Sequence, residues 1–190
     1  MPKDIQFVDA REAAPRENSS EREEIYAARE RAEEIVKGET PRAVVLIYTA
    51  AIEQALQEAI RGFLVPSNQK DDSLLETIAN SFENRIDLAY RLGMISHGMW
   101  RDLHIFRDLR DDCLARIEAF SFDHTPIQSS VASLVRNVGK QAFAGLPIGR
   151  MDTEARYAFL ARLFLVHLQN FKNSTKRLPE TGRERLYAES

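Results

Sequence analysis

The chain has 190 residues, of which 44% are hydrophobic and 29% charged, a composition that excludes a disordered or fibrous protein. The formal charge is −3, so the chain lacks the basic surplus of proteins that bind nucleic acid mainly through phosphates. The single cysteine, Cys113, excludes an internal disulfide and a multi-cysteine metal site. No signal peptide is evident, and the longest apolar run, 43–52, is shorter than a membrane span. We therefore expect a cytoplasmic protein without a membrane segment.

The scarcity of helix breakers predicts an all-α protein. Only 8 glycines and 7 prolines occur, and no segment has the alternation of a strand. We expect a flexible N-terminal arm over 1–18, one compact bundle-like domain of six to seven helices over 19–172, and a polar C-terminal tail over 173–190.

The first half of the domain has clear helix signals. Ser20 and Glu23 form a capping box, and Gly38 ends the helix that follows. Thr40 as N-cap and Pro41 open a second helix, which ends before Pro66. Over 43–57 the only charged residue in that helix is Glu53, so we expect the first half of the helix to be apolar all round and to run through the centre of the core.

The second half contains five further predicted helices. A capping box at Ser73 begins a short helix, Ser81 separates it from a helix over 82–92, and Gly93 follows as the C′ residue. Ser96 caps a helix over 97–120, whose core-facing stripe comprises Met99, Leu103, Phe106, Leu109, Cys113, Ile117 and Phe120. Helices over 125–139 and 152–172 complete the domain, with a loop over 144–149 between them, and the last has an apolar face of Tyr157, Leu160, Phe164, Leu168 and Phe171.

One charged pair is expected inside the domain. At 100° per residue Arg110 falls within the apolar stripe of its helix, and a guanidinium there needs an anion. Glu53 lies alone in an apolar helix and has the matching need. We predict a buried Glu53–Arg110 ion pair that fixes helix register, with a loss of about 3–5 kcal/mol when either partner is removed.

The histidines and acidic clusters predict no metal or cofactor site. His97 and His104 lie two helical turns apart, His167 reads as a core or interface histidine, and His124 stands beside Asp123 in a loop. Asp108, Asp111 and Asp112 alternate with Arg107, Arg110 and Arg116, which is typical of a solvated salt-bridged face. Cys113 reads as a small buried hydrophobe, and the chain has no nucleophile or phosphate-loop motif. We expect no enzyme activity.

Two interpretations of 88–104 stay open. Ala89, Gly93 and Met99 have the spacing of a helix-turn-helix, but an ordinary helical hairpin has the same pattern. The residues that could contact nucleic acid or a protein partner are His97, Trp100, Arg101, His104 and Arg107.

The helical segments 42–56, 82–95 and 100–110, together with the late helix that begins at Arg156, resemble the mannitol operon repressor family of bacterial all-α regulators. The resemblance spans roughly residues 40–170. It implies a transcriptional regulator that acts mainly through protein–protein contacts, as a homodimer, with direct binding to DNA as an option.

The same helices also resemble, more distantly, the HEPN superfamily. There an arginine followed about five residues later by a histidine forms a ribonuclease site at a dimer interface. With Arg110 as the arginine, Ala115 stands at the histidine position, so the motif is degraded. The alternative function is therefore an RNA- or nucleotide-binding domain without that ribonuclease chemistry.

Overall fold

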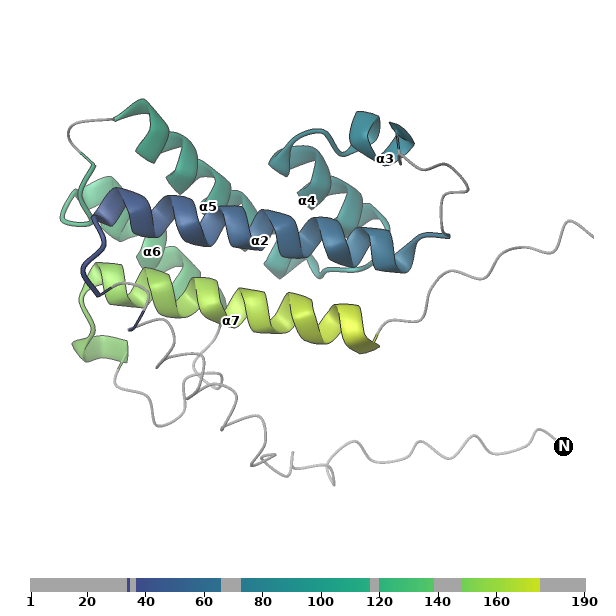
Figure 1. Ribbon diagram of the computed structural model, residues 1–190. Coiled ribbons are helices and arrows are strands. Elements are labelled where there is room, and N and C mark those ends of the chain that lie inside the picture. Colours follow the sequence, from purple (N-terminus) through teal and green to yellow (C-terminus); the bar gives the residue numbers. More distant parts are fainter. Residues whose placement is uncertain (1–33, 35–36, 66–72, 117–119, 139–147, 175–190) are drawn as a thin grey trace, which may run out of the picture.

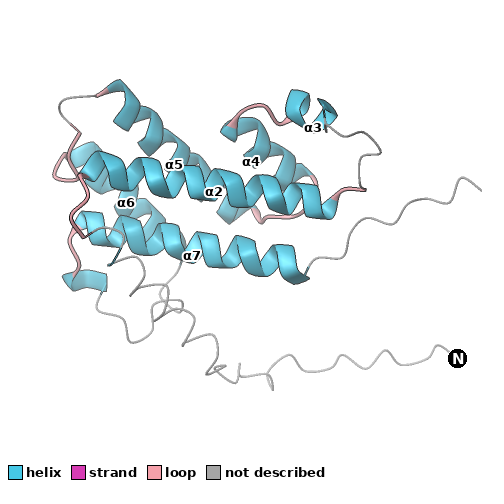
Figure 2. Ribbon diagram, in the orientation of Figure 1, coloured by secondary structure: helices cyan, strands magenta, loops and turns pink. Residues whose placement is uncertain are grey.

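The computed structural model describes residues 34, 37–65, 73–116, 120–138 and 148–174. Within these residues the chain is all-α, as the sequence predicts, with no strand (Figure 2). Most of the expected helix over 20–38, the arm, the tail beyond 174 and most of the loop over 144–149 lie outside the described residues. The elements are α2 (Pro41–Phe63), α3 (Ser73–Ile78), α4 (Phe82–Arg91), α5 (His97–Ala115), α6 (Thr125–Val138), the short 3₁₀ helix η2 (Ile148–Arg150) and α7 (Thr153–Ser174).

Helix α2 begins where the sequence predicts. The Thr40 hydroxyl accepts a hydrogen bond from the Ala43 N–H at 3.2 Å, and Pro41 occupies the first turn, where its missing N–H costs nothing. The helix ends at Phe63, slightly before the expected end at Val65, because Leu64 adopts an extended backbone.

Helices α2 and α7 lie side by side and run in the same direction (Figure 1). Near their beginnings the Tyr157 hydroxyl donates to the Val45 carbonyl at 3.3 Å. Near their ends Lys172 Nζ lies 2.9 Å from Glu58 Oε2. Helices α4 and α5 also pack against α2, and α6 packs against α5 and α7. The core therefore lies between α2, α5 and α7, with α4 and α6 extending it.

The expectation that the first half of α2 is buried all round is wrong. Its buried stripe includes Val45, Ile52 and Leu56, but Ile47 on another face is 43% exposed. The whole helix, unlike the short run 43–52, is long and apolar enough to span a membrane by length and composition. Because one face packs on three other helices, α2 is consistent with the core helix of a soluble protein.

Helices α4 and α5 form a hairpin whose local signals agree with the sequence. Ser81 and Ser96 accept hydrogen bonds from Asn84 N–H at 3.1 Å and from Met99 N–H at 3.2 Å, respectively. Gly93 has a φ of +72°, the left-handed conformation that ends a helix. These local signals therefore set where α4 begins and ends and where α5 begins.

The end of α5 differs from the prediction. The helix stops at Ala115 instead of continuing to Phe120, because Arg116 leaves helical geometry with φ −108° and ψ 64°. Leu103, Phe106, Leu109 and Cys113 are buried as expected, whereas Ile117 lies outside the described residues. Phe120 packs edge-on against Phe122 at a centroid distance of 5.5 Å.

The last helix matches its predicted start and apolar face. The Asp152 carboxylate accepts a hydrogen bond from Ala155 N–H at 2.7 Å, which caps α7. The face contributes Tyr157, Leu160, Phe164 and Leu168 to the core, with Phe171 partly buried at its edge. The helix continues to Ser174, past the domain end expected at 172.

Candidate functional site

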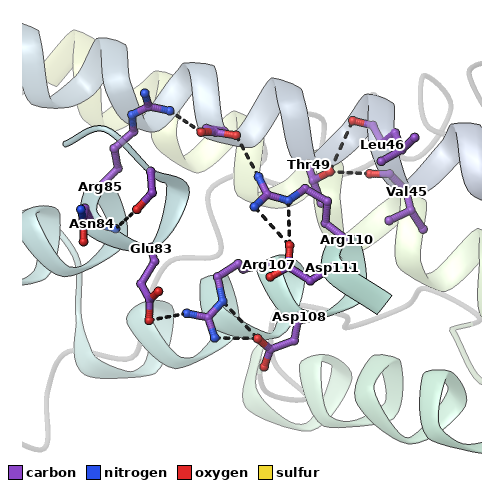
Figure 3. Close-up of polar contacts among 12 residues, drawn as sticks. Val45, Leu46, Thr49, Glu83, Asn84, Arg85, Arg107, Asp108, Arg110 and Asp111 are labelled. Atoms are coloured by element: carbon purple, nitrogen blue, oxygen red, sulfur yellow. Dashed lines mark hydrogen bonds and ion pairs between the residues drawn. The ribbon is translucent and has the colours of Figure 1, made fainter. Parts of the chain in front are cut away.

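The Glu53 carboxylate joins three helices. Its Oε2 lies 3.1 Å from Nη1 of Arg110 on α5, so the expected ion pair is present. Its Oε1 accepts a hydrogen bond from Arg85 on α4, a partner that the sequence analysis did not identify (Figure 3). One carboxylate from α2 therefore pairs with two guanidinium groups from the α4–α5 hairpin.

This network lies at the edge of the core. The side chains of Arg85, Glu53 and Arg110 keep 15%, 24% and 25% of their surface exposed, so the expected full burial of Arg110 is wrong. Arg110 also lies over the Phe82 ring, with its Cζ 5.4 Å from the centroid, and donates to Asp111 on its solvent side. The described partners of Arg110 are therefore side chains of neighbouring helices and of its own helix, which fits an ion pair that fixes helix register.

Arg107 is engaged one turn earlier on α5. Its guanidinium lies 2.7 Å from Glu83 of α4 and 2.7 Å from Asp108 (Figure 3). Burial lowers the pKa of Arg107, but the two carboxylates outweigh burial and raise that pKa above its ordinary value. Arg107 and Arg110 with their neighbouring aspartates thus form the salt-bridged face that the sequence predicts.

Four rings gather near the turn that joins α4 to α5. Tyr90 of α4 contacts His97 and Trp100 of α5 at centroid distances of 5.9 and 5.8 Å. His97 stacks on Trp100 at 5.4 Å, and His104 meets Trp100 edge-on at 4.5 Å. We call Tyr90, His97, Trp100 and His104 the ring cluster.

A carboxylate of α4 orients the ring cluster. Asp87 Oδ1 accepts a hydrogen bond from Trp100 Nε1–H at 2.7 Å and lies 3.3 Å from His104 Nε2. A partly buried indole N–H needs such an acceptor. Asp87 therefore fixes the orientation of Trp100 and gives His104 a polar partner.

Two arginines flank the ring cluster and are exposed. Arg91 follows Tyr90 on α4, and Arg101 follows Trp100 on α5. Neither forms a hydrogen bond or ion pair with another residue in the described ranges, in contrast to Arg85, Arg107 and Arg110. We call the ring cluster together with Asp87, Arg91 and Arg101 the α4–α5 surface.

Four of the five predicted contact residues therefore meet on one surface. His97, Trp100, Arg101 and His104 belong to it, whereas Arg107 is held by carboxylates further along α5. Asp87 and Tyr90 were not predicted. The signal available for Asp87 was the need of the single tryptophan for an acceptor on a neighbouring helix.

The helix-turn-helix spacing corresponds to this hairpin. Ala89 is buried and Met99 is partly buried between the helices. In the segment that would enter a groove, Asp102 and Leu103 are also buried. The N-terminal half of α5 thus packs on α4 along one side and leaves Arg101 exposed.

The remaining candidate groups offer little chemistry. No group of three or more metal-binding side chains occurs among the described residues. Cys113 is buried, and burial raises the pKa of its thiol, which disfavours the reactive thiolate. His167 is exposed on α7, so it is not a core histidine, and the other expectation, an interface histidine, stays a prediction. Ala115, at the degraded histidine position, is exposed in the last turn of α5.

Comparison of the chain with family models, curated proteins and solved structures finds no match.

Proposed function

We propose that this chain is a non-enzymatic transcriptional regulator that acts mainly through protein–protein contacts, and that the α4–α5 surface is where a protein partner binds. The observation that carries this proposal is the ring cluster, in which the single tryptophan contacts a tyrosine and two histidines and donates a hydrogen bond to Asp87. Tryptophan, tyrosine and arginine dominate the binding energy of protein interfaces. The resemblance of residues 40–170 to the mannitol operon repressor family supports the transcriptional part, and also the expectation of a homodimer.

The charge arrangement favours a protein over a nucleic acid as the partner. Along α4 and α5 the guanidinium groups of Arg85, Arg107 and Arg110 already face carboxylates of this chain. A nucleic acid presents a continuous row of phosphates, which would also meet the carboxylates of Glu83 and Asp108 on this side. A protein partner can match separate charges and rings one by one.

The alternative, a HEPN-type RNA- or nucleotide-binding domain, has weaker support. Its key arginine, Arg110, is occupied by Glu53 and Asp111, and an alanine stands at the position of the general acid or base. The rings of Tyr90 and His97 could still stack on bases, so the test below includes nucleic acid.

The proposal is tested with a photo-crosslinking amino acid at Tyr90, which is 40% exposed, in cells of the native host. Ile78 on α3, which is 51% exposed, is the matched control position. We expect a defined crosslinked species from position 90 only, destroyed by protease but resistant to nuclease, and lost when Trp100→Ala is added in a variant that retains its circular dichroism. A nuclease-sensitive species, or no species, contradicts the proposed protein contact.

Two measurements on the purified protein test the other parts of the proposal. Sedimentation equilibrium should give twice the monomer mass, and a monomer at every concentration contradicts the homodimer. Incubation with RNA should leave the RNA intact. Cleavage that Arg110→Ala abolishes would show that the chain is an enzyme. Recovery of one promoter region from genomic fragments at both about 50 and about 200 mM salt would show direct binding to DNA.

A further inference from the structure

We infer that the α4–α5 surface recognises a carboxylate-bearing, acidic segment of its protein partner. The inference rests on the proposed function, because it assigns the chemistry of the partner to the surface proposed there. The observation behind it is that the carboxylates of this surface are paired within the chain, whereas two of its arginines have no ion pair among the described residues.

The acidic groups of this region are already satisfied. Asp87 faces the Trp100 indole N–H and His104, and Glu83 pairs with Arg107. These carboxylates therefore already bind side chains of α5. A cationic partner would have to compete with Trp100, His104 and Arg107 for them.

The two basic groups that flank the rings are available. Arg91 and Arg101 are exposed, and neither forms a hydrogen bond or ion pair within the described part of the chain. They directly follow Tyr90 and Trp100 in the sequence, whose ring centroids are 5.8 Å apart, so each arginine stands one residue from a member of the same aromatic contact. Each guanidinium can bind a carboxylate through two parallel hydrogen bonds.

The rings supply the other half of the surface. Tyr90 and His97 are exposed and stand edge-on to each other, and Trp100 is partly buried beneath the stacked His97 ring. An extended peptide that places carboxylates on Arg91 and Arg101 would lay its backbone and intervening side chains on these rings. The resulting contact has an aromatic centre and charged ends, the usual arrangement of a protein interface.

The charge pattern also argues against a nucleic acid here. Two unpaired guanidinium groups match two separated carboxylates, whereas a phosphate backbone would continue along α5 past Asp108 and Asp111. The net charge of −3 adds repulsion toward any long polyanion. A short acidic peptide segment need not extend past these aspartates, and its fewer charges meet less of this repulsion than a long polyanion does.

The test uses the full chain and its single tryptophan as the reporter. Trp100 fluorescence is followed during titration with a capped hexaglutamate peptide, a capped hexalysine peptide, and a single-stranded oligothymidylate of about 12 nucleotides. We expect a saturable change with hexaglutamate that weakens as salt is raised, and weaker responses to the other two probes.

Variants locate the binding. Arg91→Gln and Arg101→Gln should each weaken hexaglutamate binding about two- to fivefold, the range of an exposed ion pair. Arg136→Gln on α6 is the matched control, because Arg136 is exposed and, among the described residues, its side chain hydrogen-bonds only to Ser133 of its own helix. All three sites are exposed, so we expect each variant to retain the fold.

The outcomes separate this inference from the proposed function. Three results would each overturn the acidic-segment inference. The chain binds hexalysine or oligothymidylate more tightly than hexaglutamate, the Arg91 and Arg101 variants bind hexaglutamate as tightly as the unchanged chain does, or hexaglutamate gives no response. If that happens while the protease-sensitive crosslink at Tyr90 persists, the surface is still a protein contact but its partner has other chemistry. A nuclease-sensitive crosslink would instead overturn the proposed function itself.

Discussion

Replacing Glu53 with alanine removes the carboxylate that accepts hydrogen bonds from both Arg85 and Arg110. The two guanidinium groups keep only 15% and 25% of their side-chain surface in contact with water, so solvent replaces the lost partner incompletely. Fully exposed ion pairs contribute about 0.2–1 kcal/mol, and breaking a fully buried pair costs about 3–5 kcal/mol. For two contacts of intermediate burial we expect Glu53→Ala to lower the free energy of unfolding by about 2–3 kcal/mol.

Arg110→Ala should cost less, about 1 kcal/mol, because Arg85 continues to neutralise Glu53. This is below the about 3–5 kcal/mol expected for a fully buried pair, and the exposure of the network is the reason. Urea unfolding followed by circular dichroism gives these values. For a domain of this size Glu53→Ala corresponds to a fall in melting temperature of about 5–10 °C.

Glu58→Ala is the matched control for Glu53→Ala. Glu58 lies on the same helix and also pairs with a cation, Lys172, but its side chain is 44% exposed and the ion pair is open to water. We expect a change within about 0.5 kcal/mol. If Glu53→Ala is no more destabilising than Glu58→Ala, the network does not hold α2 to the hairpin and the reasoning is refuted.

Three further predictions concern single side chains. Burial raises the pKa of Tyr48 to about 12, so the protonated form is favoured in the folded chain, and stability that is complete below about pH 10 should fall as the pH rises toward about 12. Tyr48→Phe should keep the stability at neutral pH, because the Tyr48 hydroxyl has no hydrogen-bond partner within the part of the chain that the structure describes. The substitution should also reduce the alkaline loss, and equal losses at about pH 11 in urea unfolding would contradict this. Gly93→Ala should cost about 1 kcal/mol or more through the φ of +72° alone, since its new Cβ meets nothing within 4 Å, whereas Gly149→Ala, with ordinary φ and equally open space, should leave the melting temperature unchanged. The Cys113 thiol is buried with a raised pKa, so its reaction with Ellman's reagent should follow global unfolding, and rapid labelling of the native chain would show that α5 opens locally.

Local signals predicted the helices well because they act over a few residues. Thr40 and Ser96 cap their helices as expected, since capping depends on a side chain and the next turn only. The end of α5 was misplaced because apolar spacing continues to Phe120, whereas the backbone turns away at Arg116. Periodicity reports which side of a helix is apolar and does not decide where the helix stops.

Contacts between helices were predictable only where a residue type was out of place. Glu53 and Arg110 stood out as charges on apolar helices, so their pairing could be expected. Arg85 and Asp87 lie on a short polar helix where charge is unremarkable, and only the packing of α4 on α2 and α5 gives them partners. Nothing in the sequence distinguishes Arg91 and Arg101 from other exposed arginines. Only the structure shows that the nearby arginines of α4 and α5 are paired with carboxylates.

The parallel pairing of α2 with α7 has a consequence for the order of folding. Tyr157 and Val45 are 112 residues apart, whereas Trp100 and Asp87 are 13 apart. Closing the longer loop costs about 4 kcal/mol of chain entropy, against about 2 kcal/mol for the hairpin. The hairpin can therefore form early and independently of α7, whereas the core closes late. On the ribosome the ring cluster can be in place before residues 153–174 have been synthesised, so a partner could engage the nascent chain at this surface.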